Sequence, residues 1–159
     1  MPTNATATSR RKPRLKLYLQ VGSRAVRAPT ATQVRRWAGA ALEKSGEITV
    51  RIVGVAEARR LNLRYRGEDR ATNVLSFPYA LSRRIVQGDV VLCAPVIARE
   101  ARSQGKTLEA HFAHMTVHAL LHLQGYDHAR RRAAARMETR EKKVLTKLGY
   151  PDPYDATPA

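Results

Sequence analysis

The sequence has few cysteines, few acidic residues and no long apolar run. Its single cysteine, Cys93, excludes a disulfide within the chain, which is typical of proteins from a reducing cytoplasm. No segment approaches the length of about 18 apolar residues that a membrane-spanning helix needs. Residues 1–13 also lack the apolar centre of a secretory signal. From these absences we expect a cytoplasmic protein with no membrane partner.

Basic residues far outnumber acidic ones. The chain has 29 lysines and arginines against 13 aspartates and glutamates, which gives a formal net charge of +16. Such an excess favours a polyanionic partner, with nucleic acid ahead of an anionic membrane surface. An arginine-rich codon usage is the alternative explanation, so the charge by itself names no substrate.

The length of 159 residues predicts one domain with a core large enough to hold a site. We place this domain at residues 14–154 and a short tail at residues 155–159. Residues 1–13 contain no acidic side chain and end in a basic cluster, which predicts a disordered basic arm that helps to hold RNA. A short organelle transit peptide is the alternative interpretation of this arm.

Apolar residues alternate in some segments and recur at helical spacing in others, which predicts an α+β fold. We expect a single domain with about four strands in a mixed sheet packed with helices, and a histidine-bearing helix buried at its centre. Residues 80–87 are expected to form a loop, with Gly88 and Asp89 opening the last strand. The expected strands are 15–21, 48–52, 73–78 and 90–93, and the expected helices are 30–44, 56–65, 95–105, 107–123 and 130–148.

All five histidines lie between His111 and His128, and three of them have the spacing of zinc ligands. His118 and His122 are four residues apart, so a helix presents both imidazoles from one face. Gly125 can adopt the left-handed conformation that ends a helix, after which the chain can turn back and bring His128 to the same point. Three neutral imidazoles with a vacant fourth position are typical of a catalytic zinc ion, at one Zn²⁺ per chain.

The other histidines continue the series along the same helix. His114, His118 and His122 cannot all bind one ion, because eight residues of helix span about 12 Å. We therefore expect His111 and His114 to lie next to the metal ligands without binding the ion, or to belong to the core. Asp127 could hydrogen-bond a histidine and fix its tautomer, or it could simply form the turn. A buried helix with hydrogen-bonded histidines and no metal is the alternative for the whole cluster.

The motif differs from that of metalloproteases at one position. Their pattern His-Glu-x-x-His-x-x-Gly-x-x-His uses the glutamate as general base, and this chain has Ala119 there. A phosphodiester needs that base less, since zinc lowers the pKa of bound water to about 7. An arginine can then stabilise charge on the phosphoryl oxygens, and Arg66 beside Gly67 is our candidate. A solvated arginine at a helix end is the alternative for Arg66.

Three segments together resemble the YbeY family of endoribonucleases. They are the block 61–78 with its Asn-Val-Leu-Ser-Phe-Pro sequence, the Gly-Asp-Val of residues 88–90, and the histidine motif 118–128. The similarity covers about two thirds of the chain and leaves the N-terminal arm outside. The chain departs from the family pattern at Ala71 and Ala119, where proline and glycine are common, and neither position is an expected ligand.

The resemblance implies a mixed α/β domain and a metal-dependent endoribonuclease specific for single strands. His118, His122 and His128 would hold zinc, and Arg66 would be the functional arginine of the family. Members act in ribosomal RNA maturation, notably at the 3′ end of the small-subunit 16S RNA, and in ribosome quality control. The implied partners are ribosomal RNA and the small ribosomal subunit, with ribosome-assembly GTPases and ribosomal proteins as further ones.

Single-stranded RNA also suits the residues themselves, because its bases can stack on aromatic side chains. Tyr65, Phe77 and Tyr126 are the candidates, and a place in the core is the alternative for each. Two other functions stay open. A non-catalytic, RNA-binding ribosome-assembly factor would use the metal structurally, although structural zinc usually has four protein ligands. A relative of the metalloproteases is the other function, but Ala119 stands where those enzymes carry the glutamate that serves as general base, which argues against peptide hydrolysis.

Overall fold

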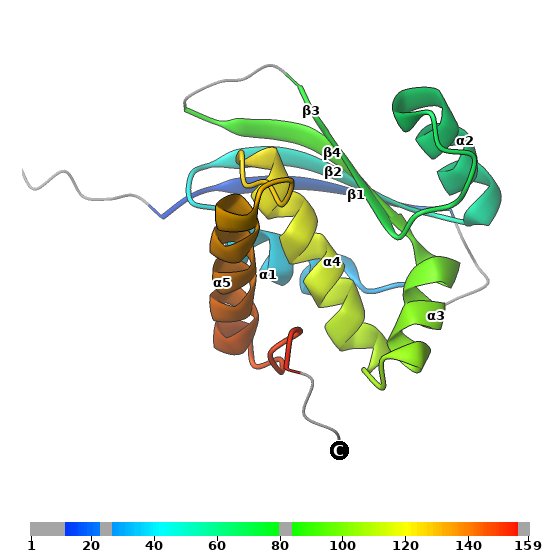
Figure 1. The fold of residues 1–159 in the computed structure, drawn as a ribbon. Coiled ribbons are helices and arrows are strands. Elements are labelled where there is room, and N and C mark those ends of the chain that lie inside the picture. Colours follow the sequence, from blue (N-terminus) through cyan, green and yellow to red (C-terminus); the bar gives the residue numbers. More distant parts are fainter. Residues whose placement is uncertain (1–11, 23–26, 80–83, 156–159) are drawn as a thin grey trace, which may run out of the picture.

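The computed structural model describes residues 12–22, 27–79 and 84–155 of the chain. Most of the expected N-terminal arm and of the expected tail therefore lies outside the described residues. The described residues form one sheet and the helices that pack on it (Figure 1). None of these helices is long and apolar enough to cross a membrane.

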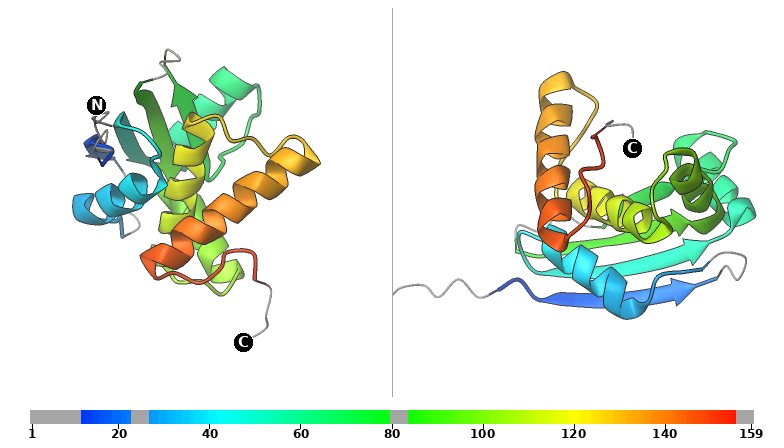
Figure 2. Two further views of the ribbon diagram at one scale, coloured as in Figure 1. Left: turned by 90° about the vertical axis from the view of Figure 1, so that its left-hand side faces the viewer. Right: turned by 90° about the horizontal axis from the view of Figure 1, so that it is seen from below.

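A four-stranded mixed sheet forms the middle of the fold (Figure 2). Its strands are β1 (Leu15–Val21), β2 (Gly46–Val53), β3 (Val74–Pro78) and β4 (Val86–Cys93), in the spatial order β1-β2-β4-β3. Strands β1, β2 and β4 run parallel, whereas β3 pairs with β4 in the antiparallel direction. Because β4 is an inner strand covered on both faces, its last four residues are apolar without interruption.

The helices cover the two faces of the sheet unequally (Figure 1). Helices α1, α4 and α5 enclose the main core with one face, and α2 packs on the other face over a smaller apolar cluster near β3 and β4. Helix α3 follows β4 directly and contacts α4. The helices are α1 (Ala31–Ala41), α2 (Val55–Arg66), α3 (Ala94–Ser103), α4 (Leu108–Leu123) and α5 (Arg131–Leu148).

Helix α4 is the buried centre of the fold. Thr107 caps its N-terminus, where the hydroxyl accepts a hydrogen bond of 3.1 Å from the backbone N–H of Ala110. Apolar residues occupy nearly its whole circumference, and it contacts α1, α3, α5 and the sheet. Polar side chains on this helix therefore lose their water and need partners within the protein.

The expected architecture is confirmed: an α+β domain with four strands in a mixed sheet and the histidine helix at its centre. The two largest differences from the expected boundaries concern α1 and β4. Helix α1 ends at Ala41 and not at residue 44, because Leu42 already has an extended backbone (φ −76°, ψ 129°). Strand β4 begins at Val86, inside the expected loop, so Gly88 and Asp89 lie within the strand.

Gly88 is required by packing and does not mark the end of a loop. A Cβ at this position would lie 2.7 Å from Cδ2 of Leu123 and 2.7 Å from the carbonyl oxygen of Phe77. Glycine therefore lets the end of α4 approach the sheet closely at the junction of β3 and β4. This approach holds the end of the histidine helix against the sheet.

We expect Gly88→Ala to lower the free energy of unfolding by about 1–3 kcal/mol, because Leu123 or the backbone of β3 must move to admit the methyl group. Urea denaturation measures the change. Gly39→Ala is the matched control, since a Cβ there meets nothing within 4 Å and Gly39 lies inside α1. That control should gain about 0.5–1 kcal/mol. Equal stability of Gly88→Ala and the parent protein would contradict tight packing at this point.

Candidate metal centre

Three imidazoles meet at the C-terminal end of α4. The ligand atoms of His118, His122 and His128 all lie within 4.8 Å of one another. Nδ1 of His128 is 3.0 Å from Nε2 of His122, and the ring centroids of His118 and His122 are 4.7 Å apart. Gly125, with a φ of 97°, reverses the chain after the helix so that His128 returns to the other two. The structure thus brings together the three histidines that the sequence spacing singled out.

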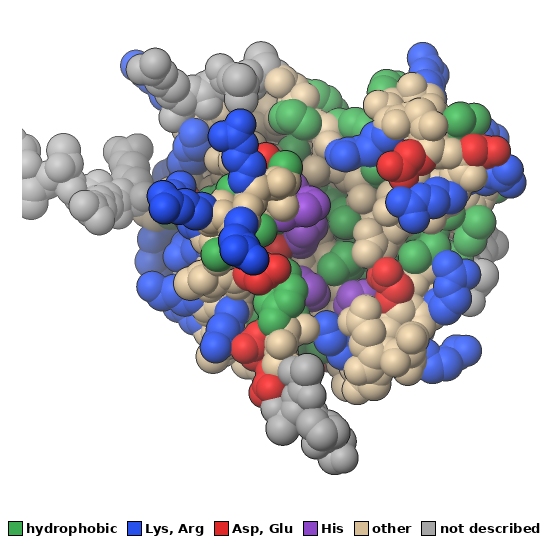
Figure 3. All heavy atoms as spheres, in the orientation of Figure 1, with side chains coloured by type: hydrophobic (Ala, Val, Ile, Leu, Met, Phe, Trp, Pro, Cys, Tyr) green, Lys and Arg blue, Asp and Glu red, His purple; other side chains and the backbone are tan. Residues whose placement is uncertain are grey.

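The three histidines line a cleft of about 300 Å³ between α4 and the segment that runs from α2 into β3. Figure 3 shows histidine side chains at the bottom of a hollow on this face of the molecule. Ala119 also lines the cleft, so the position that carries the glutamate of metalloproteases presents only a methyl group. The remaining lining residues are Asn62, Arg66, Glu68, Arg70, Thr72, Asn73, Val74, Leu75 and Ser76.

Arg66 lines the same cleft as the histidines. It is the last residue of α2, and Gly67 ends the helix in the left-handed conformation, with a φ of 72°. The buried side chain of Asn62 donates a 2.9 Å hydrogen bond to the carbonyl of Arg70 and so fixes the loop that follows. Arg66 is exposed and forms no ion pair within the described ranges. Its guanidinium can therefore bind an anion in the cleft.

A buried carboxylate lies directly behind His118. Glu141 of α5 is fully buried, and its Oε1 accepts a 2.5 Å hydrogen bond from Nδ1 of His118. Its Oε2 accepts a 2.9 Å bond from Nε2 of His114 and a further bond from the hydroxyl of Tyr154. Burial raises the pKa of Glu141, but the hydrogen bonds from His114 and His118 outweigh it and bring the pKa down to about 2. Glu141 is therefore ionised at neutral pH and acts only as an acceptor.

The ionised carboxylate fixes the protons of two histidines. His118 must carry its proton on Nδ1, which leaves the lone pair of Nε2 for the cleft. His114 must carry its proton on Nε2. The ligand atoms of His114, His118 and Glu141 also lie within 4.8 Å of one another. In this group, however, the facing nitrogens of both histidines carry the protons that they donate to Glu141, so these nitrogens have no lone pair for a metal ion. The candidate metal ligands are therefore His118, His122 and His128.

The chemistry of this donor set fits a divalent transition metal. Tetrahedral Zn–N bonds of about 2.0–2.1 Å place ligand nitrogens roughly 3.3 Å apart, close to the separation of His122 and His128. Burial, together with His118 and His128, lowers the pKa of His122 to about 4, so this ligand is neutral at pH 7. Glu141 contributes a buried negative charge, and no lysine or arginine pairs with it in the described part of the chain. A cation bound to Nε2 of His118, on the side of the ring that faces away from Glu141, would balance that charge.

A second chain of hydrogen bonds supports the floor of the cleft. Nε2 of His111 and Nδ2 of Asn73 each lie 3.0 Å from Oε1 of Glu100. Burial lowers the pKa of His111, which keeps its ring neutral. His111 and His114 each lie against a carboxylate of another helix, Glu100 of α3 and Glu141 of α5.

Asp127 lies in the turn between α4 and α5. Its Oδ1 accepts a 3.0 Å hydrogen bond from the backbone N–H of Ala129, as in a turn-forming aspartate. Glu141 is the carboxylate that hydrogen-bonds His114 and His118, whereas Asp127 acts on His122 through its charge.

The two tyrosine candidates lie in different places. Tyr65 is 57% exposed and packs edge-to-face against Phe77, with ring centroids 5.1 Å apart. It precedes Arg66 in the sequence, but its side chain does not line the cleft. Tyr126 does not line this cleft, and its hydroxyl donates a 2.6 Å hydrogen bond to Glu43.

Sequence reasoning missed Glu141 and Tyr154. One signal was available for Glu141, which lies on the apolar stripe of α5 at helical spacing from Met137, Val144 and Leu148. An acid on a buried helix face needs a partner, and the nearby histidine helix offered several. No comparable signal marks Tyr154, which reaches the site from the segment after α5.

A family model described as "Endoribonuclease YbeY" matches residues 23–149 of this chain. The chain is 61% identical over 128 residues to "Endoribonuclease YbeY" of Aromatoleum aromaticum, which covers 80% of this chain and 82% of that protein. It is 53% identical over 143 residues to the protein of the same name from Thiobacillus denitrificans, covering 89% of this chain and 97% of the relative.

A solved structure also resembles the fold. The solution structure of TM1509 from Thermotoga maritima superimposes with a TM-score of 0.56 and covers 91% of this chain and 99% of its own. Its sequence identity is 21%, so this likeness concerns the fold alone.

We expect Glu141→Gln to weaken zinc binding by about 10–100-fold, because a neutral amide no longer holds the His118 Nδ1 proton as firmly. Competition with a chelator measures the affinity, and circular dichroism checks the fold. Glu138→Gln is the matched control, since Glu138 lies one turn earlier on α5 and is exposed. Tyr154→Phe should give a smaller loss in the same direction. Unchanged affinity in Glu141→Gln would show that the carboxylate does not orient a ligand.

Proposed function

The chain belongs to the YbeY family of endoribonucleases, and from this premise we propose that it is a metal-dependent endoribonuclease that cleaves single-stranded RNA. The single observation that carries the proposal is the shared cleft, in which three histidines at ligand distances and one unpaired arginine face the same space. The preferred metal is zinc, at one ion per chain, because three neutral imidazoles are a ligand set typical of catalytic zinc.

His118, His122 and His128 would hold the ion, and Glu141 would keep Nε2 of His118 free of a proton. The chemistry that such an ion supplies when bound is activation of a water molecule and neutralisation of charge on the phosphate. Ala119 leaves room beside the ligands, since a methyl group neither fills the cleft nor competes for the ion. The chain thus needs no separate carboxylate base at that position.

Arg66 would bind the phosphodiester under attack. Its guanidinium presents two parallel N–H donors that match two phosphoryl oxygens. Charge builds on those oxygens as the bond to the nucleophile forms, so a fixed cation stabilises the transition state more than the ground state. The bond from Asn62 to Arg70 fixes the loop after Arg66, which limits the motion of the arginine.

A single strand is the proposed form of the substrate. Its backbone can enter the cleft without a complementary strand, and an unpaired base can stack on the exposed ring of Tyr65, which Phe77 supports from the side. We extend the proposal to ribosomal RNA, at the 3′ end of the small-subunit 16S RNA, in the cytoplasm. Family membership and the net charge of +16 support this choice of partner.

We expect His128→Ala to lose bound metal and RNA cleavage together while the domain stays folded, because His128 is exposed and lies in the turn after α4. Elemental analysis of the purified protein gives the metal content, and a gel assay on single-stranded RNA gives the cleavage rate. The parent protein should hold about one zinc per chain. Full cleavage by a metal-free His128→Ala protein would end the proposal.

Arg66→Ala should slow cleavage by about 10²–10³-fold and leave the metal content unchanged, because it removes transition-state stabilisation and no ligand. Arg66→Lys should recover only part of the rate, since an ammonium lacks the planar pair of donors. Arg60→Ala is the control, because Arg60 lies on the same helix and does not line the cleft. If Arg66→Ala weakened RNA binding but kept the single-turnover rate, a binding role would replace the catalytic one.

A further inference from the structure

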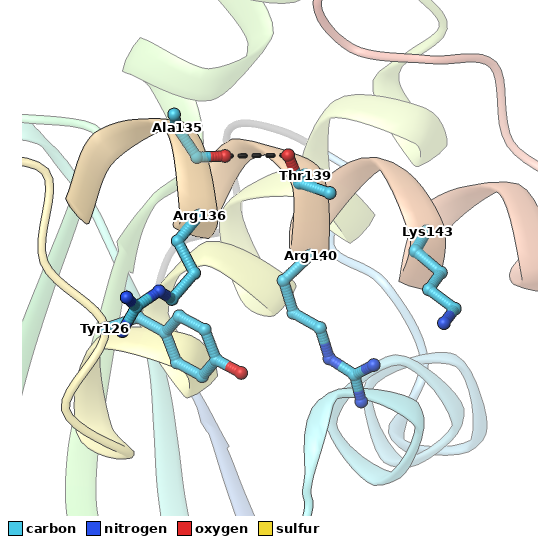
Figure 4. A pocket seen from close by; sticks show the side chains of 6 residues that line it. All are labelled: Tyr126, Ala135, Arg136, Thr139, Arg140 and Lys143. Atoms are coloured by element: carbon cyan, nitrogen blue, oxygen red, sulfur yellow. Dashed lines mark hydrogen bonds between the residues drawn. The ribbon is translucent and has the colours of Figure 1, made fainter. Parts of the chain in front are cut away.

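Helix α5 carries a basic face outside the histidine cleft. Arg136, Arg140 and Lys143 follow one another at intervals of four and three residues, so they project from one side of the helix. Together with the ring of Tyr126 they line a separate pocket of about 400 Å³ (Figure 4). We call these four residues the α5 surface. The three cations extend about 10 Å along the helix, from Arg136 to Lys143.

Two of these cations are not neutralised by the protein. Arg136 and Lys143 form no ion pair within the described ranges of the chain. Arg140 lies 3.3 Å from Glu43, which also accepts the hydroxyl of Tyr126. One acid is thus shared between an arginine and a tyrosine, and the α5 surface keeps a net positive charge. Such a surface attracts anions, and an anion with several charges can contact more than one of its cations.

The α5 surface lies next to the candidate metal centre. Tyr126 precedes the ligand His128 by two residues, so their Cα atoms are at most about 7.6 Å apart. The turn that brings His128 into the cleft therefore also carries Tyr126 of the α5 surface. Figure 3 shows lysine, arginine and acidic side chains over α5, beside the histidines in the hollow. Arg136 also lines a further hollow together with Gly125 and Asp127 of that turn.

We propose that the α5 surface binds the phosphodiester backbone of the RNA substrate, beyond the nucleotides held in the cleft. This inference rests on the proposed function, since it assumes that RNA occupies the cleft. Lys143 and the guanidiniums of Arg136 and Arg140 contact successive phosphates, and the ring of Tyr126 offers a face on which a base stacks. The α5 surface adds affinity for long RNA and contributes nothing to the cleavage step.

RNA fits this surface better than an anionic membrane does. An amphipathic helix that binds membranes inserts an apolar face, and the apolar face of α5 is already buried in the main core. The residues of that face are Met137, Val144, Leu145 and Leu148. The three cations lie on the exposed part of α5, where they line a pocket with an aromatic wall.

The test compares two double variants of the full-length protein loaded with zinc. Arg136→Ala with Lys143→Ala removes two cations of the α5 surface. Lys16→Ala with Arg60→Ala removes two exposed cations that line neither this pocket nor the cleft, so both proteins change net charge equally. Binding is measured by fluorescence anisotropy, in an Arg66→Ala background that slows cleavage. The probes are single-stranded RNAs of about 5 and about 30 nucleotides, chosen to span one or several contact sites.

We expect the α5 double variant to bind the long RNA at least about 10-fold more weakly than the control double variant at the same salt concentration. The slope of log affinity against log salt should also fall by about 1.4, which corresponds to two lost phosphate contacts. Binding of the short RNA should stay within about twofold, because the short RNA fills only the cleft. Equal affinities of the two double variants for the long RNA would overturn the proposal.

Two further measurements distinguish a failure of the α5 proposal from a failure of the proposed nuclease function. Cleavage of the short RNA by protein with Arg66 intact tests the proposed function, and the absence of cleavage would refute that function while leaving the long-RNA titration readable. Binding to vesicles of phosphatidylglycerol tests the membrane as an occupant. If the α5 double variant lost vesicle binding and kept its affinity for long RNA, the surface would belong to a membrane and the proposal would fail.

Discussion

The candidate site depends on one buried carboxylate. Glu141 has no exposed surface, and three hydrogen-bond donors from two other segments of the chain converge on its two oxygens. Removing a carboxylate from water costs several kcal/mol unless such partners replace the water. These partners are His114, His118 and Tyr154. The hydrogen bond from His118 that helps to keep Glu141 ionised therefore also sets the tautomer of His118. Folding and ligand orientation therefore rest on the same contacts.

This arrangement explains why a site of polar residues can lie in the most buried helix of the protein. Helix α4 is enclosed by α1, α3, α5 and the sheet, yet its histidines at positions 111 and 114 each meet a carboxylate from a neighbouring helix. Toward its C-terminal end α4 borders the histidine cleft, where His118 and His122 lie beside His128. The close packing at Gly88 holds that end of the helix against the sheet. The core thus fixes the positions from which the ligands project.

Much of the fold and part of the site could be predicted from the sequence, because local spacing carries the information. The interval between His118 and His122, and the glycine before His128, define a cluster without any tertiary knowledge. Gly88 was misinterpreted, since a glycine that permits close packing of distant segments looks the same as a loop glycine. The partnership of Glu141 with His118 joins two helices, and Tyr154 reaches it from beyond α5. Contacts between such elements leave only weak traces in the sequence, such as an acid on an apolar stripe.

The central claim is that three imidazoles hold one divalent ion. Glu141 hydrogen-bonds one of these imidazoles, that of His118, and does not bind the ion itself. X-ray absorption spectroscopy of the zinc-loaded protein tests this claim most directly, because it reports the number and type of atoms bound to the metal. The account predicts three nitrogen ligands of imidazole at about 2.0 Å and one oxygen from solvent. The same spectrum in Glu141→Gln should keep this ligand set. A carboxylate oxygen from Glu141 in the parent protein, lost in that variant, would contradict the account.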